Sequence, residues 1–184
     1  MSAFLIVLTA LCTVLLTSAN LMYERVLEGK LQEMRMEILR DFGVSFTDET
    51  FATVFEEYVD LQEAADGSYY HFRGEPRQVT VMTAGSGLWS TIELLITINV
   101  DTLEMKDLKV LSHGETPGLG GRIEEEWFAE QFRGLDVSQG VKLVTNRTGA
   151  TGEVDAISGA TATSRSVMSI INRTLSALEP DANI

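Results

Sequence analysis

Hydroxyl side chains are concentrated in residues 158–164, which read SGATATS. Ser158, Thr161, Thr163 and Ser164 each contribute an oxygen to this short stretch. A hydroxyl becomes a nucleophile for turnover when a base activates it, and the sequence places no histidine or lysine beside these residues. We therefore predict no catalytic residue here. A hydroxyl without a base can still be the passive acceptor that another enzyme modifies.

The residues that follow this stretch have the spacing of a helix. A buried apolar stripe over residues 161–178 consists of Val167, Ile170, Ile171, Leu175 and Leu178. The start of such a helix offers unpaired N–H groups and the positive end of the helix dipole, which together favour an anion. Gly159 and Ala160 would let a phosphate approach the backbone, while Ser158 and Thr161 can add hydroxyl donors. An ordinary helix N-cap would use the same residues and is the competing interpretation.

The bulk composition indicates one acidic domain. The chain has 184 residues, enough for a single hydrophobic core, and a formal net charge of -13 at pH 7. Nucleic acid is not expected as a partner, because a phosphate backbone needs lysine and arginine to neutralise it. A single cysteine, Cys12, cannot form an intramolecular disulfide, and His71 and His113 match no metal-binding spacing. We expect no metal site.

The N-terminal segment is apolar and carries no charged side chain before Glu24. A helix of about 20 apolar residues spans the hydrocarbon core of a bilayer, so residues 1–23 predict one transmembrane helix. A cleaved signal peptide that ends near Ala19 is the alternative. Apolar residues at helical spacing then predict an amphipathic helical stalk over residues 24–43, which Gly43 ends.

Residues 44–184 are predicted to form the folded domain. Predicted helices run from Thr47 to Leu61, over 124–132 and over 161–178. A turn is expected at Asp66 and Gly67. Short runs rich in β-branched and aromatic residues predict strands at 69–72, 78–82, 92–100, 108–111 and 141–145. The expected fold class is therefore α+β, an antiparallel sheet flanked by helices and preceded by the transmembrane helix.

Residues 155–164, DAISGATATS, resemble the flavinylation motif of a family of flavoprotein subunits. That family contains the G subunit of Rnf complexes and the C subunit of sodium-translocating NADH:quinone reductase. Its members carry FMN joined through the phosphate, as an ester, to the last threonine of a D-x-x-S-G-A-T-x-T pattern. The matching residues here are Asp155, Ser158, Gly159, Ala160, Thr161 and Thr163. The resemblance implies a covalent FMN on Thr163, with Thr161 and Ser164 as neighbouring alternatives.

A second segment, residues 112–134, resembles the ETPGLG loop of the same family and the helix after it. The matching residues are Glu115, Thr116, Pro117, Gly118, Leu119 and Gly120. A Pro-Gly turn that joins a strand to a helix would use the same residues. The resemblance implies that the cofactor site consists of Thr163, Ser158, Gly159, Ala160, Thr161, Glu115, Thr116, Gly118 and Leu119. Either Glu115 or Thr116 is expected to approach the flavin ring.

The resemblance implies a membrane-anchored flavoprotein subunit that relays electrons in an ion-translocating oxidoreductase. The Rnf type, which links ferredoxin and NAD, is preferred. The alternatives are the C subunit of the sodium-translocating NADH:quinone reductase and a stand-alone anchored FMN-binding electron carrier. A further alternative is an interaction module without flavin, in which SGATAT only caps a helix.

The expected partners are other membrane subunits of such a complex and a flavin transferase for maturation. Basic residues follow the apolar segment while none precedes it, which by charge alone would keep the large domain in the cytoplasm. The resemblance implies the opposite side, so we expect a single-pass protein of the inner (cytoplasmic) membrane. Its folded domain would then lie on the periplasmic or extracellular side.

Overall fold

A computed structural model describes residues 2–74 and 77–178 of the chain, apart from the side chains of residues 2, 3, 5 and 8. Its helices are α1 (Ser2–Asp41), α2 (Phe51–Tyr58), the 3-10 helix η1 (Gly120–Glu124), α3 (Glu126–Glu130) and α4 (Thr161–Leu178). Its strands are β1 (Val59–Ala64), β2 (Gly67–Phe72), β3 (Gln78–Ser86), β4 (Thr91–Asn99), β5 (Glu104–Ser112), β6 (Leu135–Asp136), β7 (Lys142–Val144) and β8 (Glu153–Asp155).

The main sheet is an antiparallel meander. Strands β1 to β6 pair in sequence order, each with the next one along the chain. Strands β7 and β8 form a separate parallel pair just before α4. The predicted α+β class with an antiparallel sheet and flanking helices is confirmed.

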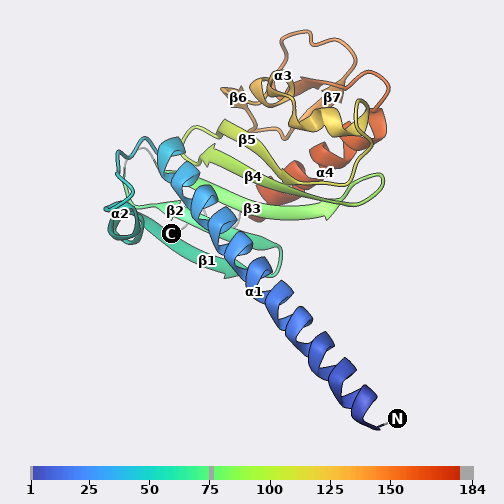
Figure 1. The fold of residues 1–184 in the computed structure, drawn as a ribbon. Helices are drawn as coiled ribbons and strands as arrows, with labels where there is room; N and C mark the ends of the chain where they lie inside the picture. Colours follow the sequence, from blue (N-terminus) through green and yellow to red (C-terminus); the bar gives the residue numbers. More distant parts are fainter. Residues whose placement is uncertain (1, 75–76, 179–184) are drawn as a thin grey trace.

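Helices cover both faces of this sheet, α1 on one face and α4 on the other (Figure 1). The alternation along β4 explains the two layers, because successive side chains of a strand point to opposite faces. Leu94 and Ile96 are fully buried in the cluster that contains the apolar stripe of α4. Leu95, between them, is buried in the cluster that contains Ile38 and Leu39 of α1. Strand β4 therefore contributes to two hydrophobic cores.

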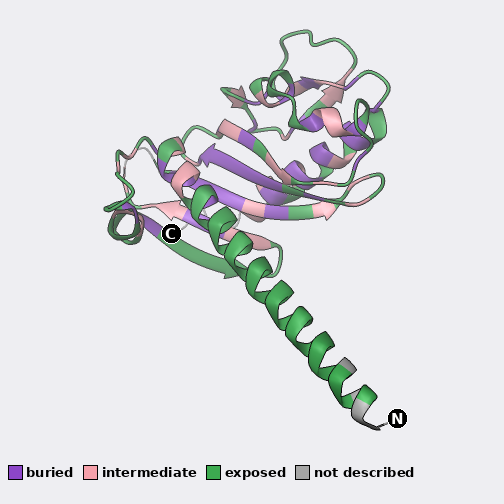
Figure 2. Cartoon of the chain, viewed as in Figure 1, coloured by how far each residue is buried: buried purple, intermediate pink, exposed green. Residues whose placement is uncertain are grey.

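Helix α1 is continuous across the predicted boundary between membrane helix and stalk. Its C-terminal part packs on the sheet through Met34, Ile38 and Leu39, whereas the described side chains of its N-terminal half are exposed (Figure 2). Among the described residues, no helix combines the length and the apolarity that a membrane crossing requires.

The transmembrane helix predicted over residues 1–23 is thus not supported by the described residues. That prediction depended in part on residues 1–3, 5 and 8, whose side chains lie outside the described part of the chain. The remainder belongs to a helix that runs on without a break through Glu24 and Arg25.

The helix predicted from Thr47 to Leu61 is shorter than expected. Helix α2 ends at Tyr58, and the chain continues as β1, which pairs with β2. Val59 is buried while Leu61 is 45 % exposed, so the apolar spacing read as one helix belongs to two elements. The turn of the β1–β2 hairpin consists of Ala65 and Asp66, and Gly67, which was predicted to lie in the turn, begins β2.

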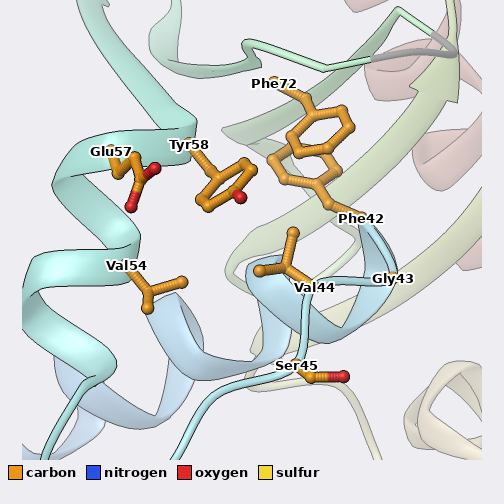
Figure 3. A pocket seen from close by; sticks show the side chains of 8 residues that line it. All are labelled: Phe42, Gly43, Val44, Ser45, Val54, Glu57, Tyr58 and Phe72. Atoms are coloured by element: carbon orange, nitrogen blue, oxygen red, sulfur yellow. The ribbon is translucent and has the colours of Figure 1, made fainter.

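A groove lined by aromatic rings lies where the end of α1 meets α2 and β2 (Figure 3). Its volume is about 520 Å³. The Phe42 and Phe72 rings stack there with centroids 5.0 Å apart, and the Tyr58 ring stacks on Phe72 at 6.2 Å. None of the residues that line this groove belongs to the site predicted from the sequence.

Candidate functional site

The start of α4 is shaped by a tight backbone turn and one internal hydroxyl. Gly159 has a φ of +80°, a left-handed conformation that favours glycine. The buried Ser164 hydroxyl accepts a hydrogen bond from the Ile157 N–H at 3.0 Å and donates one to the Ala160 carbonyl at 3.1 Å. Ser164 therefore holds the turn that leads into the helix.

Of the two threonine hydroxyls in the first helical turn, one is buried and one is exposed. Thr161 and the nearby Ser158 are exposed. Thr163 is only 1 % exposed, and its Oγ1 donates a hydrogen bond of 2.6 Å to Oε2 of Glu115. The structure thus joins the two sequence motifs through a direct contact between residues 48 positions apart.

Glu115 is a buried carboxylate whose two oxygens have different partners. It is 4 % exposed, and its Oε1 accepts hydrogen bonds of 2.9 Å from the backbone N–H groups of Leu88 and Trp89. Burial raises the pKa of Glu115, but the hydrogen bonds from Thr163 and from the backbone outweigh burial, so the pKa lies below its ordinary value. Glu115 is therefore ionised at neutral pH.

Two glycines make room for this carboxylate. A Cβ on Gly87 would lie 2.5 Å from Glu115 Oε1. A Cβ on Gly120 would lie 2.6 Å from Thr163 Oγ1 and 2.8 Å from Glu115 Oε2. Neither distance is compatible with a side chain, so the hydroxyl–carboxylate pair requires glycine at both positions.

The rest of the ETPGLG segment forms an exposed turn over the start of α4. The Thr116 carbonyl accepts hydrogen bonds from the N–H groups of Leu119 and Gly121, and Gly118 has a φ of +73°. Leu119 is 48 % exposed, and its Cδ2 lies 3.5 Å from where a Cβ on Gly159 would stand. Leu119 and Gly159, predicted from separate motifs, are therefore neighbours.

The backbone of Glu115 is fixed by a neighbouring histidine. The Glu115 N–H donates a hydrogen bond of 3.0 Å to Nδ1 of His113. On the other side of the ring, Nε2 of His113 lies 3.1 Å from Oε1 of Glu124. The sequence alone assigns His113 no role, and the structure makes it a support for Glu115.

Sequence reasoning missed the contribution of the β3–β4 hairpin to this site. Gly87, Leu88 and Trp89 lie at its tip and contact Glu115, yet the stretch GSGLW matches neither motif. A glycine between polar and aromatic residues at a turn is too common a signal to indicate a site. Only the fold shows that this tip faces the carboxylate.

The arrangement suits the binding of a phosphate group. Small residues and the first-turn N–H groups of α4 can receive an anion, and a threonine hydroxyl lies at the same place. The exposed, left-handed Gly159 leaves the backbone before the helix open to close approach. The residues present therefore fit a phosphate ester at this helix start.

Residues 87–176 match the model of the FMN-binding domain family. This range contains the β3–β4 tip, the ETPGLG turn and the start of α4. The flavin-binding class expected from the sequence is confirmed.

The chain is similar to subunits of two kinds of complex. It is 37 % identical over 106 residues to the C subunit of the Na(+)-translocating NADH-quinone reductase of Yersinia pestis, covering 54 % of this chain and 40 % of that protein. It is 38 % identical over 86 residues to the G subunit of the ion-translocating oxidoreductase complex of Methanosarcina acetivorans, covering 47 % of this chain and 43 % of that protein. The matches thus span less than half the length of these relatives.

Solved structures share the fold. The crystal structure of Shewanella oneidensis NqrC aligns with a TM-score of 0.64 at 20 % identity, covering 79 % of this chain and 91 % of that one.

Relatives named as the C subunit of the quinone reductase are found in several organisms. The expected preference for the Rnf type is therefore not favoured, and the quinone reductase type is at least as well supported.

Proposed function

We propose that this chain is an electron-carrying flavoprotein subunit of an ion-translocating oxidoreductase of the quinone reductase or Rnf type. The observation that carries the proposal is the buried contact between Thr163 and Glu115, which unites the two flavin motifs at the start of α4. The match to the FMN-binding domain and the names of the relatives support it. When bound, FMN supplies the redox chemistry, and the protein supplies position and electrostatics.

We propose Thr163 as the residue that carries FMN through a phosphoester. Its hydroxyl lies in the first turn of α4 and donates a hydrogen bond to Glu115 of the ETPGLG segment. The Ser164 hydroxyl is already committed to the turn before the helix, which makes it a poor alternative. Thr161 is exposed and remains the matched comparison for experiments.

The remaining predicted residues would hold the phosphate and border the ring. Ser158, Gly159, Ala160 and Thr161 would receive the phosphate at the helix start, where the dipole offsets its negative charge. Thr116, Gly118 and Leu119 lie in the exposed turn beside Gly159, where a ring attached to Thr163 would emerge. Glu115 faces the attachment oxygen, so we place it at the ester and not at the ring.

We further propose that the N-terminal half of α1 attaches the protein to a membrane, leaving residues 44–184 as the folded flavin domain. Large apolar side chains project from it into solvent, among them Leu11, Val14, Leu15, Leu16, Leu21 and Met22. Such a concentration of exposed apolar side chains is typical of a surface that contacts lipid. The periplasmic or extracellular side, the other membrane subunits and the flavin transferase belong to this same proposal.

The test of the attachment residue is the variant Thr163→Ala. Produced in a host that makes the flavin transferase, the wild-type chain should show a fluorescent flavin band after denaturing electrophoresis and a mass increase equal to FMN minus water. Thr163→Ala should lose both, with a stability loss of about 1–3 kcal/mol, because it removes the hydrogen bond that the buried Glu115 carboxylate accepts from Thr163 Oγ1.

Thr161→Ala is the matched control, since it removes the exposed hydroxyl of the same turn. It should keep the covalent flavin. Covalent flavin on Thr163→Ala, or its loss only in Thr161→Ala, would reassign the attachment residue. A wild-type chain that stays dark in a competent host would refute the flavin proposal itself. Co-purification of the full chain with neighbouring subunits would distinguish the quinone reductase type from the Rnf type.

A further inference from the structure

The buried Glu115 carboxylate lies at hydrogen-bond distance from the one oxygen that must lose its proton if FMN is attached to Thr163. We propose that Glu115 is the proton acceptor for this attachment, so that the chain supplies the base for its own modification. This inference rests on the proposed attachment at Thr163. The sequence places no base beside SGATATS, and the fold brings Glu115 to the Thr163 hydroxyl from 48 positions away.

The chemistry of attachment defines what the flavin donor must be. Joining a free phosphate monoester to a hydroxyl releases water and is unfavourable in aqueous solution. The donor must therefore carry the flavin phosphate on a better leaving group, as in a flavin dinucleotide with a phosphoanhydride bond. The bond from Thr163 Oγ1 to phosphorus forms, and the anhydride P–O bond breaks. The leaving nucleotide phosphate keeps that electron pair, Glu115 Oε2 takes the hydroxyl proton, and nothing is oxidised or reduced.

The electrostatics of the pair suit this transfer. Glu115 is ionised before the reaction, so it can accept a proton. An approaching phosphate adds negative charge beside the carboxylate, which favours its protonated form and so assists the transfer from Oγ1. After transfer, a protonated Glu115 can donate a hydrogen bond toward the ester. A buried repulsion between carboxylate and phosphodiester is thereby avoided.

The fold keeps the acceptor in place while the site opens. Thr163 is 1 % exposed and Gly120 packs against its Oγ1, so the end of the Thr116–Gly120 turn must move aside before the donor can reach this oxygen. Glu115 Oε1 is held independently of this turn by the N–H groups of Leu88 and Trp89. The charged or titratable groups that face Glu115 are His113, bonded to its backbone N–H, and Glu124 behind the imidazole.

The test compares full-length apo chains in their rate of covalent flavin uptake from a flavin dinucleotide, with purified flavin transferase and in-gel fluorescence as the readout. Glu115→Gln keeps an oxygen for the Leu88 and Trp89 N–H groups but cannot take a proton. We expect its rate to fall at least about 100-fold, the range that a general base contributes. A rate within threefold of wild type overturns the proposal.

A pH profile separates proton transfer from a structural role. The ratio of the wild-type rate to the Glu115→Gln rate should shrink as the pH falls through the pKa of Glu115, because the wild-type base is then neutralised. Titration of the transferase cancels in this ratio, and a ratio that does not change with pH counts against proton transfer.

Thermal unfolding of each variant provides the folding control. If Glu115→Gln does not unfold cooperatively, Glu115→Asp replaces it. Its carboxylate is one methylene shorter and misses Oγ1, so a rate within twofold of wild type would overturn the proposal. Failure of the proposed function is distinguishable, since the wild-type chain itself would then take up no covalent flavin.

Discussion

At the scale of single residues, the candidate site depends on two glycines, whose missing side chains leave room for Glu115 and Thr163. Gly87 approaches one oxygen of Glu115, and Gly120 approaches the other oxygen together with the Thr163 hydroxyl. A buried carboxylate needs all its hydrogen-bond partners to offset the loss of water. The two glycines allow backbone and hydroxyl donors to come close enough to supply them.

The substitution Gly120→Ala tests this packing. The added methyl would stand 2.6 Å from Thr163 Oγ1, so the hydroxyl or the carboxylate has to move. We expect a loss of about 1–3 kcal/mol in the free energy of unfolding, as for other overpacked sites, and slower flavin uptake. Urea denaturation and in-gel fluorescence measure the two effects.

Gly29→Ala is the matched control, because a Cβ there meets nothing within 4 Å. It lies inside α1, so alanine should raise local helix stability by up to about 1 kcal/mol. If Gly120→Ala and Gly29→Ala behave alike, the close contact at Gly120 has no energetic consequence.

The residues of both motifs could be named from the sequence, but their pairing could not. Either Glu115 or Thr116 was expected near the flavin ring, and the structure shows the Glu115 carboxylate bonded to the Thr163 hydroxyl. The contact joins two residues 48 positions apart through a sheet edge and a helix start, and no local pattern encodes that distance. Leu88 and Trp89 were missed for the same reason, because they act through backbone N–H groups that any residue carries.

At the scale of elements, the end of α1 meets the sheet through a charged cluster. Asp41 Oδ2 accepts a hydrogen bond of 3.1 Å from Thr97 Oγ1, and that hydroxyl lies 2.9 Å from Thr80 Oγ1. Burial raises the pKa of Asp41 to about 6, the charges of Asp107 and Glu37 add to the rise, and Thr97 and Lys109 oppose it. The contact thus places a carboxylate where its ionised form is disfavoured.

Asp41→Asn should remove a pH dependence of stability. The folded pKa of Asp41, about 6, lies above its ordinary value of 3.8, so the folded state binds this proton more tightly. Stability from this group is therefore present below about pH 4 and is lost as the pH rises through about 6. At neutral pH the Asn variant should be more stable than wild type by about 1–3 kcal/mol.

Urea denaturation at about pH 4 and about pH 7 would show this difference shrinking at the lower pH. An Asn variant less stable than wild type at neutral pH would show that the hydrogen bond from Thr97 outweighs burial. A substitution of Arg133, which pairs with Asp107, is the control, because it changes the charges near Asp41 without removing the hydrogen bond from Thr97.

The bounds of an element could be predicted where a single helical spacing of apolar residues continued along its whole length. The helix over 161–178 was predicted with the bounds that the structure gives, because its apolar stripe runs through five turns and glycine precedes it. The region from Thr47 to Leu61 failed because a helix and a strand share one run of apolar residues there. Strands β6 and β8, of two and three residues, are too short for an alternation to be visible.

At the scale of the whole molecule, α1 has two parts with different environments. Ile38 and Leu39 are fully buried on the sheet, whereas Leu15 and Leu16 are 60 % and 72 % exposed. Burial of an aliphatic side chain stabilises a fold by about 1.5–3 kcal/mol, so only the first pair contributes to folding. The second pair is available to contact something outside the chain.

One substitution in each part of this helix should therefore affect a different property, folding stability in one case and binding to lipid vesicles in the other. Ile38→Ala should cost about 2–5 kcal/mol in urea denaturation and leave binding to lipid vesicles unchanged. Leu15→Asp should change stability by about 0.5 kcal/mol or less but weaken co-flotation with vesicles. Equal flotation of wild type and Leu15→Asp would contradict the proposed membrane attachment.

Strand β4 separates the two hydrophobic cores, and this restricts where residues can be inserted or deleted. Leu95 and Thr97 face α1, while Leu94, Ile96 and Ile98 face α4. Inserting or deleting a single residue within the strand would exchange the two sets and place a threonine among the apolar side chains that pack against α4. Insertions and deletions should therefore be confined to surface loops such as 145–152, and β4 should be the part of the chain least tolerant of them.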